Sequence, residues 1–212
     1  RNRLSKKRYD YTKKLKESGQ KQAYYMSMEF LVGRTLRNNL FNLGIEDEVR
    51  SFLAEKNFDL DRIYDMEPDP GLGNGGLGRL ASCYLDALTS NDYPVTGFSI
   101  LYEFGIFKQV IANGWQQEYP DNWLGMGQYG LVHRSDEEIE IKFYGKTEEH
   151  WTNEGLKVNY EDYKSIIAEP YDLMISGYKS EAVNVLRLWK SKANAGFDMK
   201  LFERGEYARS SE

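Results

Sequence analysis

Glycine density at positions 71–78 constrains the fold of this chain more than any other feature. Five of these eight residues are glycine, in the run Gly71-Leu72-Gly73-Asn74-Gly75-Gly76-Leu77-Gly78. Apolar residues at helical spacing continue to about Ser90, so the pattern predicts a loop that opens a helix. Glycines leave backbone N–H groups open to a ligand, and the helix dipole adds partial positive charge there. The segment is therefore a candidate anion site, with phosphate as its usual occupant, and we expect the first helical turn to face the largest cleft.

Two other readings of the glycine run stay open. It matches the pattern G-x-G-x-x-G in two registers, which glycine density alone produces. A loop with Pro68 and Pro70 precedes it, where a dinucleotide-binding fold has the end of a hydrophobic strand, and no Gly-Lys-Ser/Thr follows as in a nucleotide P-loop. The structural alternative is a loop that packs tightly and binds nothing. A dinucleotide-dependent oxidoreductase is the weaker functional alternative.

Periodicity and turn residues predict the remaining elements. Helices are expected at residues 3–18, 34–43, 46–56 and 76–90, with a short turn at 59–64. Strands are expected at residues 22–28, 93–98, 104–112, 139–144, 157–160, 163–168 and 183–189, the first of them buried. The apolar stripe of the helix at 76–90 comprises Leu77, Leu80, Ala81, Tyr84, Leu85 and Leu88. This order favours an α/β fold, with one parallel β–α–β unit around the glycine run and a β-rich second half.

Length and composition bound the class of protein. A chain of 212 residues with 41% hydrophobic and 29% charged residues is typical of a globular protein with one core in one fold unit. No apolar run reaches 18 residues and the start has no apolar signal core, so we expect neither a membrane span nor a secretory signal. The single cysteine, Cys83, fits a cytoplasmic location and a place in the core. The start without methionine suggests a processed protein or a piece of a longer one.

Charge is unevenly distributed along the chain. Residues 1–23 hold nine Lys or Arg and two acidic residues, a net of +7, so the other 19 basic and 31 acidic residues leave the remainder at −12. We interpret residues 1–20 as a basic helical extension with a solvated face, attracted to the acidic remainder. Nucleic-acid binding is disfavoured because a body at −12 repels a phosphate backbone.

Carboxylates near aromatic rings make a second candidate site. Glu103, Glu118 and Asp121 lie among the aromatic residues of segments 102–105 and 114–124, a combination that suits sugar rings but is also common in a core. His133 and His150 stand 17 residues apart without ligand spacing, so no metal site is predicted. No serine lies in a nucleophile motif.

Several motifs in order resemble the glycogen and α-glucan (starch, maltodextrin) phosphorylase family. They are Tyr24-Tyr25-Met26-Ser27-Met28-Glu29-Phe30-Leu31-Val32-Gly33-Arg34-Thr35, Gly71 to Asp86, Tyr102-Glu103-Phe104-Gly105-Ile106-Phe107, Trp115-Gln116, Asp121-Asn122-Trp123-Leu124, Phe143-Tyr144-Gly145, Gly177-Tyr178, Val183 to Trp189 and Phe197-Asp198 through Phe202. The resemblance covers nearly the whole chain from about residue 20 and concerns the N-terminal portion of the family.

The resemblance implies an enzyme that attacks terminal α-1,4-linked glucose with inorganic phosphate and releases glucose 1-phosphate with retention, using the phosphate group of pyridoxal phosphate. The implied fold is the N-terminal half of a two-domain GT-B-type glycosyltransferase, with a Rossmann-like three-layer α/β/α core and a β-rich subregion. Residues 21–212 would then be a partial N-terminal α/β domain after the extension at 1–20. The full-length enzyme is expected to be a cytoplasmic homodimer without nucleic-acid or membrane partners.

The family's site residues carry over onto the glycine run. Asn74, Gly75, Gly76 and Leu77 fall on positions that bind substrate and phosphate, and Gly75 and Gly76 lie near the cofactor phosphate. Asp69 falls near the sugar pocket. Leu31 stands where some members carry a tyrosine, so no hydroxyl can reach the cofactor region from that position. The resemblance assigns no catalytic residue to this chain.

The cofactor lysine of the family has no counterpart here. Its Asn-Met-Lys signature belongs to a C-terminal domain and is not found in these 212 residues. We therefore expect the chain alone to be inactive and to hold no pyridoxal phosphate covalently, since the groups that orient both phosphates come largely from the missing C-terminal domain. The alternative is a stand-alone carbohydrate-binding or regulatory module that kept the fold without the chemistry.

Overall fold

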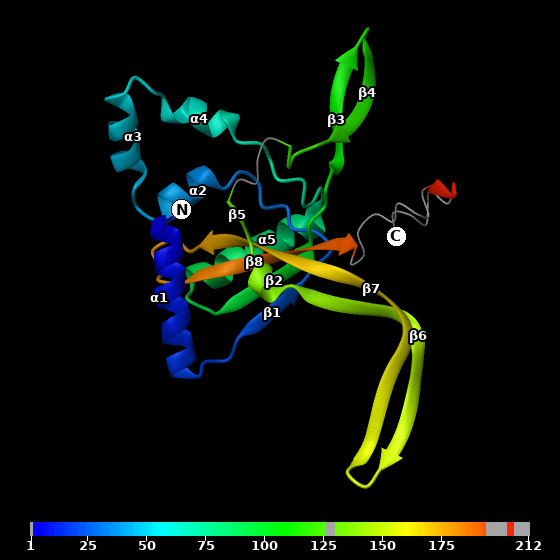
Figure 1. Ribbon diagram of the computed structural model, residues 1–212. Helices are drawn as coiled ribbons and strands as arrows, with labels where there is room; N and C mark the ends of the chain where they lie inside the picture. The colour runs from blue at the N-terminus through cyan, green and yellow to red at the C-terminus, as the bar shows by residue number, and fades with distance from the viewer. Residues whose placement is uncertain (1, 126–129, 194–202, 206–212) are drawn as a thin grey trace. The chain divides into compact units, whose positions relative to one another are not determined.

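The computed structural model describes residues 2–125, 130–193 and 203–205 (Figure 1). The chain divides into two compact units: unit 1 is Arg1–Val132 with Tyr171–Leu188, and unit 2 is His133–Pro170 with Trp189–Glu212. Length alone favoured one fold unit. The chain has two compact units, because residues 139–168 pair with one another in a long hairpin. The hydrophobic core cluster lies entirely in unit 1.

Helices precede most of the strands along the chain. The elements are α1 (Asn2–Ser18), β1 (Ala23–Met26), α2 (Leu36–Asn42), α3 (Glu46–Ala54), α4 (Leu60–Met66), α5 (Gly76–Ser90), β2 (Val95–Ile100), β3 (Gly105–Ala112), β4 (Trp115–Asp121), β5 (Leu131–His133), the 3-10 turn η1 (Ser135–Glu137), β6 (Ile139–Thr152), β7 (Gly155–Ser176) and β8 (Val183–Ala193). The helices predicted at 3–18, 34–43, 46–56 and 76–90 are confirmed, and the turn at 59–64 is the helix α4. Strands β4 and β5 were not predicted.

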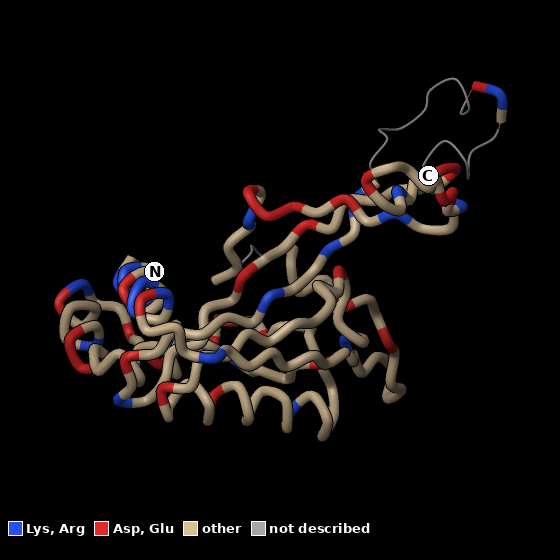
Figure 2. Tube along the Cα trace, turned by 90° about the horizontal axis from the view of Figure 1, so that it is seen from below, with Lys and Arg blue, Asp and Glu red and all other residues tan. Residues whose placement is uncertain are grey.

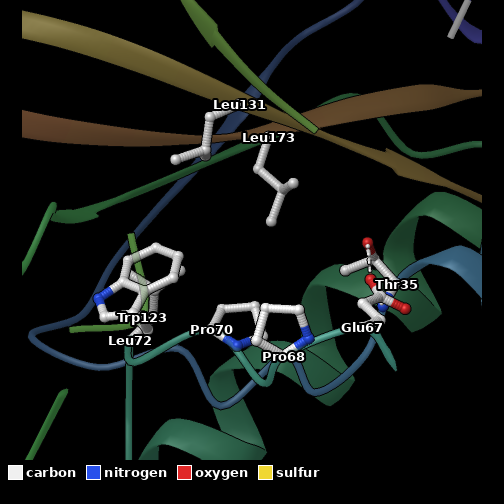
Figure 3. A pocket seen from close by; sticks show the side chains of 8 residues that line it. All are labelled: Thr35, Glu67, Pro68, Pro70, Leu72, Trp123, Leu131 and Leu173. Atoms are coloured by element: carbon white, nitrogen blue, oxygen red, sulfur yellow. Dashed lines mark hydrogen bonds between the residues drawn. The ribbon is translucent and has the colours of Figure 1, made fainter. Parts of the chain in front are cut away.

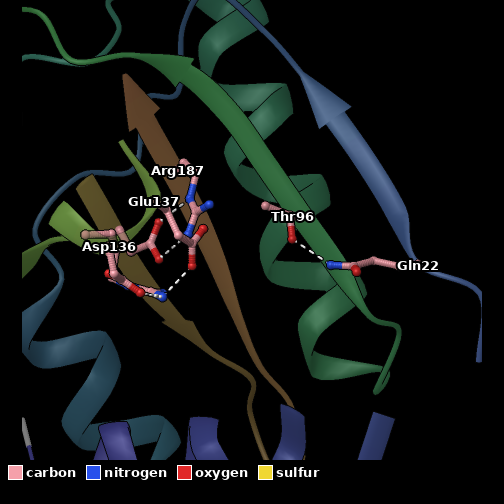
Figure 4. A network of polar contacts seen from close by, with 7 residues as sticks. Gln22, Thr96, Asp136, Glu137 and Arg187 are labelled. Carbon is pink, nitrogen blue, oxygen red and sulfur yellow. Dashed lines mark hydrogen bonds and ion pairs between the residues drawn. The ribbon is translucent and has the colours of Figure 1, made fainter. Parts of the chain in front are cut away.

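The predicted parallel β–α–β unit is confirmed. β1 pairs in parallel with β2, from Ala23 opposite Val95 to Met26 opposite Phe98, and α5 lies between them in the sequence. The sheet order is β1-β2-β8-β7-β5, while β3 and β4 form a separate hairpin. Gln22 donates a 2.7 Å hydrogen bond to Thr96 and fixes the start of β1 against β2 (Figure 4). The arrangement is a mixed α/β fold.

Strand β1 is not buried, which corrects the prediction for residues 22–28. The side chain of Met26 is 81% exposed, and Tyr24 is exposed as well. β1 stands at the end of the strand order and has one strand partner among the described residues. An aromatic-rich run thus predicted the strand correctly but not its place at the edge of the sheet.

Helix α5 buries only part of the apolar stripe that was predicted: Ala81 and Leu85 belong to the core, and Leu88 packs against it. Leu77, Leu80 and Tyr84 are exposed, whereas Ser82 and Thr89 are buried. The two hydroxyls are satisfied within the helix, since Ser82 donates to the carbonyl of Gly78 and Thr89 to that of Leu85. Cys83 is exposed, so its predicted place in the core is wrong, because the buried face of α5 runs through Ala81, Ser82 and Leu85.

The basic helix α1 belongs to unit 1 and contacts it along one side, while most of its residues are exposed, as expected of a solvated face (Figure 2). Leu4 and Tyr11 are buried on one side of it. Arg8 donates to the carbonyl of Val183 at 2.7 Å, and Lys14 forms a 2.5 Å ion pair with Glu181. The expected attraction between basic arm and acidic body is therefore realised as specific contacts.

An exposed ion pair joins α3 to α4. Arg50 binds both carboxylate oxygens of Asp61, at 2.8 and 3.0 Å. The hydrogen bond from Arg50 is the main cause that lowers the pKa of Asp61 below its ordinary 3.8.

Since the pKa of Asp61 is lower in the folded state, the pair stabilises the fold above pH 3.8 and loses that effect as the pH falls through the folded pKa. We expect Asp61→Asn to lower the thermal unfolding temperature near pH 7 and to converge with the wild type in strong acid. Thermal melts between pH 7 and strong acid measure the difference in unfolding temperature between the variant and the wild type. Asp47→Asn, a change at an exposed residue, serves as the control. A constant difference at every pH would contradict the assignment.

The two strands predicted at 157–160 and 163–168 are one continuous strand, β7. It pairs antiparallel with β6, from Ile139 opposite Ala168 to Thr152 opposite Gly155. Asp162 has a positive φ of 53° and is skipped in the register opposite Gly145, which has φ 70°. The register is the same on both sides of this point, so the break in the apolar pattern is a local distortion within one ladder and not a turn. The predicted turn at Asn113-Gly114 is confirmed between β3 and β4, with both residues at positive φ.

None of the described helices is long and apolar enough to span a membrane.

Candidate functional site

The glycine run ends in the open N-terminus of α5. The helix starts at Gly76, and its N-cap Gly75 has extended backbone angles and no side chain to cap the turn. The first intrahelical bond runs from the N–H of Arg79 to the carbonyl of Gly75 at 3.0 Å. Within the described residues, the N–H groups of Gly76, Leu77 and Gly78 meet no acceptor. Three donors thus converge at the positive end of a 15-residue helix.

The glycines of the run separate into two kinds. A Cβ at Gly73 would lie 2.9 Å from the backbone N of Leu31, and one at Gly78 would lie 3.0 Å from Cβ of Glu29. A Cβ at Gly75 or Gly76 would meet nothing within 4 Å, and neither residue has a positive φ. Gly73 and Gly78 are therefore required by packing. Nothing in the described part of the chain requires a glycine at positions 75 and 76, and the missing side chains leave this backbone open to close approach by a ligand.

The segment after β1 holds the loop on both sides. Phe30 N–H donates to the carbonyl of Leu72 at 2.9 Å, and Leu31 N–H donates to the carbonyl of Gly78 at 3.0 Å. Arg79 donates back to the carbonyl of Leu31 at 3.2 Å. Leu31, where a tyrosine would have offered a hydroxyl, thus contributes backbone contacts to the site.

Glu29 was not assigned a role from the sequence, yet it contacts the predicted site directly. Its Oε2 accepts a 3.2 Å hydrogen bond from the N–H of Asn74. The signal was present in the sequence as an acidic residue inside a motif shared with the family, but nothing in the spacing of 45 residues linked it to the loop.

The acidic loop before the glycine run is anchored through Glu67. Its carboxylate accepts the N–H groups of Thr35 and Leu36 and the hydroxyl of Thr35, at 2.8 to 3.1 Å, and so caps α2 from outside that helix. Beside it lies a small cavity of about 20 Å³, shown in Figure 3 and lined by Thr35, Glu67, Pro68, Pro70, Leu72, Trp123, Leu131 and Leu173. Asp69, in the same loop, is exposed to solvent.

Replacing Glu67 by Ala is expected to destabilise unit 1 through the loss of this cap. The start of α2 loses both its acceptor and a negative charge at its N-terminus, which costs about 1–2 kcal/mol. For a chain of this size that corresponds to a fall of roughly 2–8 °C in the unfolding temperature. Calorimetry of Glu67→Ala beside the exposed Glu55→Ala measures the effect, and equal unfolding temperatures for the two variants would contradict it.

The expectation that α5 opens into the largest cleft is wrong for the described residues. A groove of about 960 Å³ lies elsewhere in unit 1, lined by residues of α1, α2 and α4 among others. Neither Gly76 nor Leu77 lines it, and Leu77 is 80% exposed. The predicted residues Asn74, Gly75, Gly76 and Leu77 are adjacent on one exposed turn, and the described residues leave this turn open to solvent.

The aromatic and carboxylate segments are divided between core and surface. Trp123 belongs to the core cluster and donates to the carbonyl of Tyr102 at 3.0 Å. Trp115 and Glu118 lie exposed on β4, where Glu118 accepts from Gln116 at 2.6 Å. The core interpretation thus holds for Trp123 and not for Trp115.

One titratable cluster in unit 2 was missed by the sequence. The possible ligand atoms of His133, Glu138 and Glu169 lie within 4.8 Å of one another. The residues come from β5, the segment after η1, and β7, so no spacing pattern could bring them together. Lys192 contacts the buried Glu169 at 3.2 Å and already supplies a positive charge there.

Comparison with known proteins identifies the family of the chain. The model of the family described as Phosphorylase, carbohydrate phosphorylase, matches residues 53–212. Glycogen phosphorylase of Chlamydia pneumoniae is 44% identical over 193 residues, which is 91% of this chain and 23% of that protein. The brain form of human glycogen phosphorylase is 41% identical over 191 residues, 90% of this chain and 22% of that protein. The glycogen phosphorylase of Synechocystis is 43% identical over 184 residues.

The chain spans about 23% of the length of the curated relatives that it matches. The family match covers most of the chain, including the glycine run and α5. With this match and relatives above 40% identity, the chain belongs to the carbohydrate phosphorylase family.

Proposed function

We propose that this chain is part of an α-1,4-glucan phosphorylase, a glycosyltransferase that uses inorganic phosphate to cleave the terminal α-1,4-linked glucose of glycogen, starch or maltodextrin. The products are glucose 1-phosphate, with retention at the anomeric carbon, and a glucan one residue shorter. The observation that carries the proposal is the turn at Gly75–Leu77, where two glycines have no packing role and the helix donors point to solvent.

The proposed part of Gly75, Gly76 and Leu77 is to donate backbone hydrogen bonds to a phosphate or to negative charge that develops in the reaction. Such donors are fixed in place before the reaction, so they cost no reorganisation when the charge appears. Asn74 borders the same turn, and we place Asp69 near the sugar in the assembled enzyme. No catalytic residue is assigned within these 212 residues.

Pyridoxal phosphate is the cofactor that we propose for the full-length enzyme, and when bound it supplies a phosphate group to the chemistry. Its phosphate fits the donor set of this chain, because free N–H groups at a helix N-terminus suit an anion and the neighbouring glycines allow close approach. Gly75 and Gly76 would lie near that phosphate. The Schiff-base lysine would come from a C-terminal domain, so we expect no covalent cofactor on this chain.

The proposed architecture is the N-terminal half of a GT-B-type fold with a Rossmann-like core, in which residues 1–20 form a basic helical extension and residues 21–212 part of the first domain. The parallel pairing of β1 and β2 with α5 between them supports it. The proposed full-length protein is a cytoplasmic, allosterically controlled homodimer whose partners are the glucan, inorganic phosphate and glucose 1-phosphate, without nucleic-acid or membrane partners.

An activity comparison tests the proposal. The isolated 212-residue chain is expected to show no phosphorolysis. After incubation with pyridoxal phosphate and dialysis to remove free cofactor, it is expected to show no imine absorbance. A full-length protein that contains this chain is expected to release glucose 1-phosphate from glycogen. Stoichiometric cofactor that survives dialysis on the isolated chain would contradict the first part. Glucan binding without any activity in the longest natural form of the protein would favour a stand-alone binding or regulatory module.

A further inference from the structure

We propose that Glu29 is the positioning residue of the glycine loop. Its carboxylate accepts a hydrogen bond from the N–H of Asn74 and so fixes the direction in which the backbone N–H groups of Gly76, Leu77 and Gly78 point. The role in phosphate binding rests on the proposed function, whereas the hold on the loop does not. Glu29 follows β1 directly, and its own N–H bonds the hydroxyl of Ser27 at 3.3 Å, which orients the segment toward α5.

The first support is the pattern of hydrogen bonds around the loop. Backbone bonds from Phe30 and Leu31 fix the two ends of the loop, at Leu72 and Gly78. Among the described residues, Asn74 has the one N–H group between positions 73 and 78 that meets an acceptor, and that acceptor is Glu29 Oε2 at 3.2 Å. The middle of the loop therefore has its anchor in this side chain.

The second support is the space left for the carboxylate. A Cβ at Gly78 would lie 3.0 Å from Cβ of Glu29 and 3.1 Å from its Oε2. A Cβ at position 78 would force the Glu29 side chain or the loop to shift by a few tenths of an ångström. The absence of a side chain at Gly78 thus allows the close approach of Glu29, so the positions of these two residues depend on each other.

The third support is the hydrogen-bonding character of the side chain. A carboxylate is an acceptor without donors, so it bonds the N–H of Asn74 and cannot compete for a carbonyl. It occupies one donor and leaves those of Gly76, Leu77 and Gly78 for a ligand.

The test uses the 212-residue chain with Glu29→Ala, Glu29→Gln and the exposed Glu55→Ala as a charge-matched control. Amide hydrogen exchange and ¹H–¹⁵N spectra report on Asn74 to Leu77, first without ligand and then during titration with inorganic phosphate. We expect Glu29→Ala to speed exchange at Asn74 roughly tenfold or more, as loss of one charge-assisted hydrogen bond implies, and to change the phosphate-dependent shifts of Gly75 to Leu77. Glu29→Gln retains an acceptor and is expected to stay within roughly threefold of the wild type.

Unchanged exchange at Asn74 and unchanged loop resonances in Glu29→Ala would overturn the proposal. An equal increase in the exchange rate at Asn74 in a folded Glu29→Gln variant would overturn the proposal as well, because the amide oxygen of Gln can still accept the same hydrogen bond. If the wild-type chain shows no phosphate-dependent shift at Gly75 to Leu77, the phosphate site of the proposed function fails, and the exchange rates alone decide the role of Glu29. Should Glu29→Ala not fold, Glu29→Asp carries the comparison: its side chain is one methylene shorter, so exchange at Asn74 is expected to speed up, and unchanged exchange would overturn the proposal.

Discussion

Gly76→Ala in the full-length phosphorylase is expected to lower turnover by about a hundredfold to a thousandfold, the usual effect of losing one well-placed donor to developing charge. The added methyl group stands on the exposed first turn of α5, where it meets nothing in the described residues. Under the proposed function it keeps the phosphate from approaching the backbone N–H groups closely. Stability should hold or rise by up to about 1 kcal/mol, because the residue is helical, has no positive φ and gains helix propensity.

Steady-state phosphorolysis and thermal unfolding of Gly76→Ala, measured on the same preparation, separate the two effects. Asp86→Ala, an exposed change on the same helix, serves as the control. Near-normal turnover in Gly76→Ala would remove this turn from the mechanism. A collapse of folding would instead mean that the glycine is structural.

Gly73→Ala is expected to act in the opposite way, on stability. Its methyl group would lie 2.9 Å from the backbone N of Leu31 and 3.1 Å from the backbone carbon of Phe30, and backbone atoms cannot swing aside as a flexible side chain does. The strand-to-loop bonds from Phe30 to Leu72 and from Leu31 to Gly78 must lengthen or break. Overpacking of this kind costs about 1–3 kcal/mol.

Chemical denaturation of the 212-residue chain measures this cost. An unfolding midpoint shifted clearly to lower denaturant, with an unchanged slope, is the expected result. The matched control is Gly76→Ala in the same chain, which differs only in lacking a neighbour for the new methyl group. Equal stability of the two variants would show that the segment at residues 29–31 is free to move away from the loop.

The sequence by itself determined the family, the elements with strong periodicity and the position of the glycine turn. Gly75-Gly76 followed by a helical run to Ser90 required a helix N-terminus there, because local propensity and chain direction suffice to set it. For the same reason α1, α3 and the turn at Asn113-Gly114 fell where they were predicted. The likeness to phosphorylases rested on several motifs in order, and the family match over residues 53–212 agrees with it.

Burial was decided by the tertiary structure. The apolar stripe of α5 placed Ala81 and Leu85 correctly in the core. Its members Leu77 and Leu80 are exposed, while Ser82 and Thr89 are turned inward. Periodicity indicates which residues share a face of the helix, but it does not indicate which face packs against the rest of the protein. Asn184 in β8 is a further case: it is buried because its amide bonds Thr89 and the carbonyl of Tyr93 and accepts the N–H of Val95, partners about 90 residues away.

Contacts between distant segments likewise decided which glycines are needed for packing and which are open to a ligand. Five glycines at 71–78 look alike in the sequence, and each could serve packing or a ligand. The approach of residues 29–31, from more than 40 positions earlier, makes Gly73 and Gly78 necessary for the fold and leaves Gly75 and Gly76 without a structural reason. Local pattern determines where a helix begins, because that depends on neighbours in the chain, whereas only the packed structure determines which atoms of that turn remain free for a ligand.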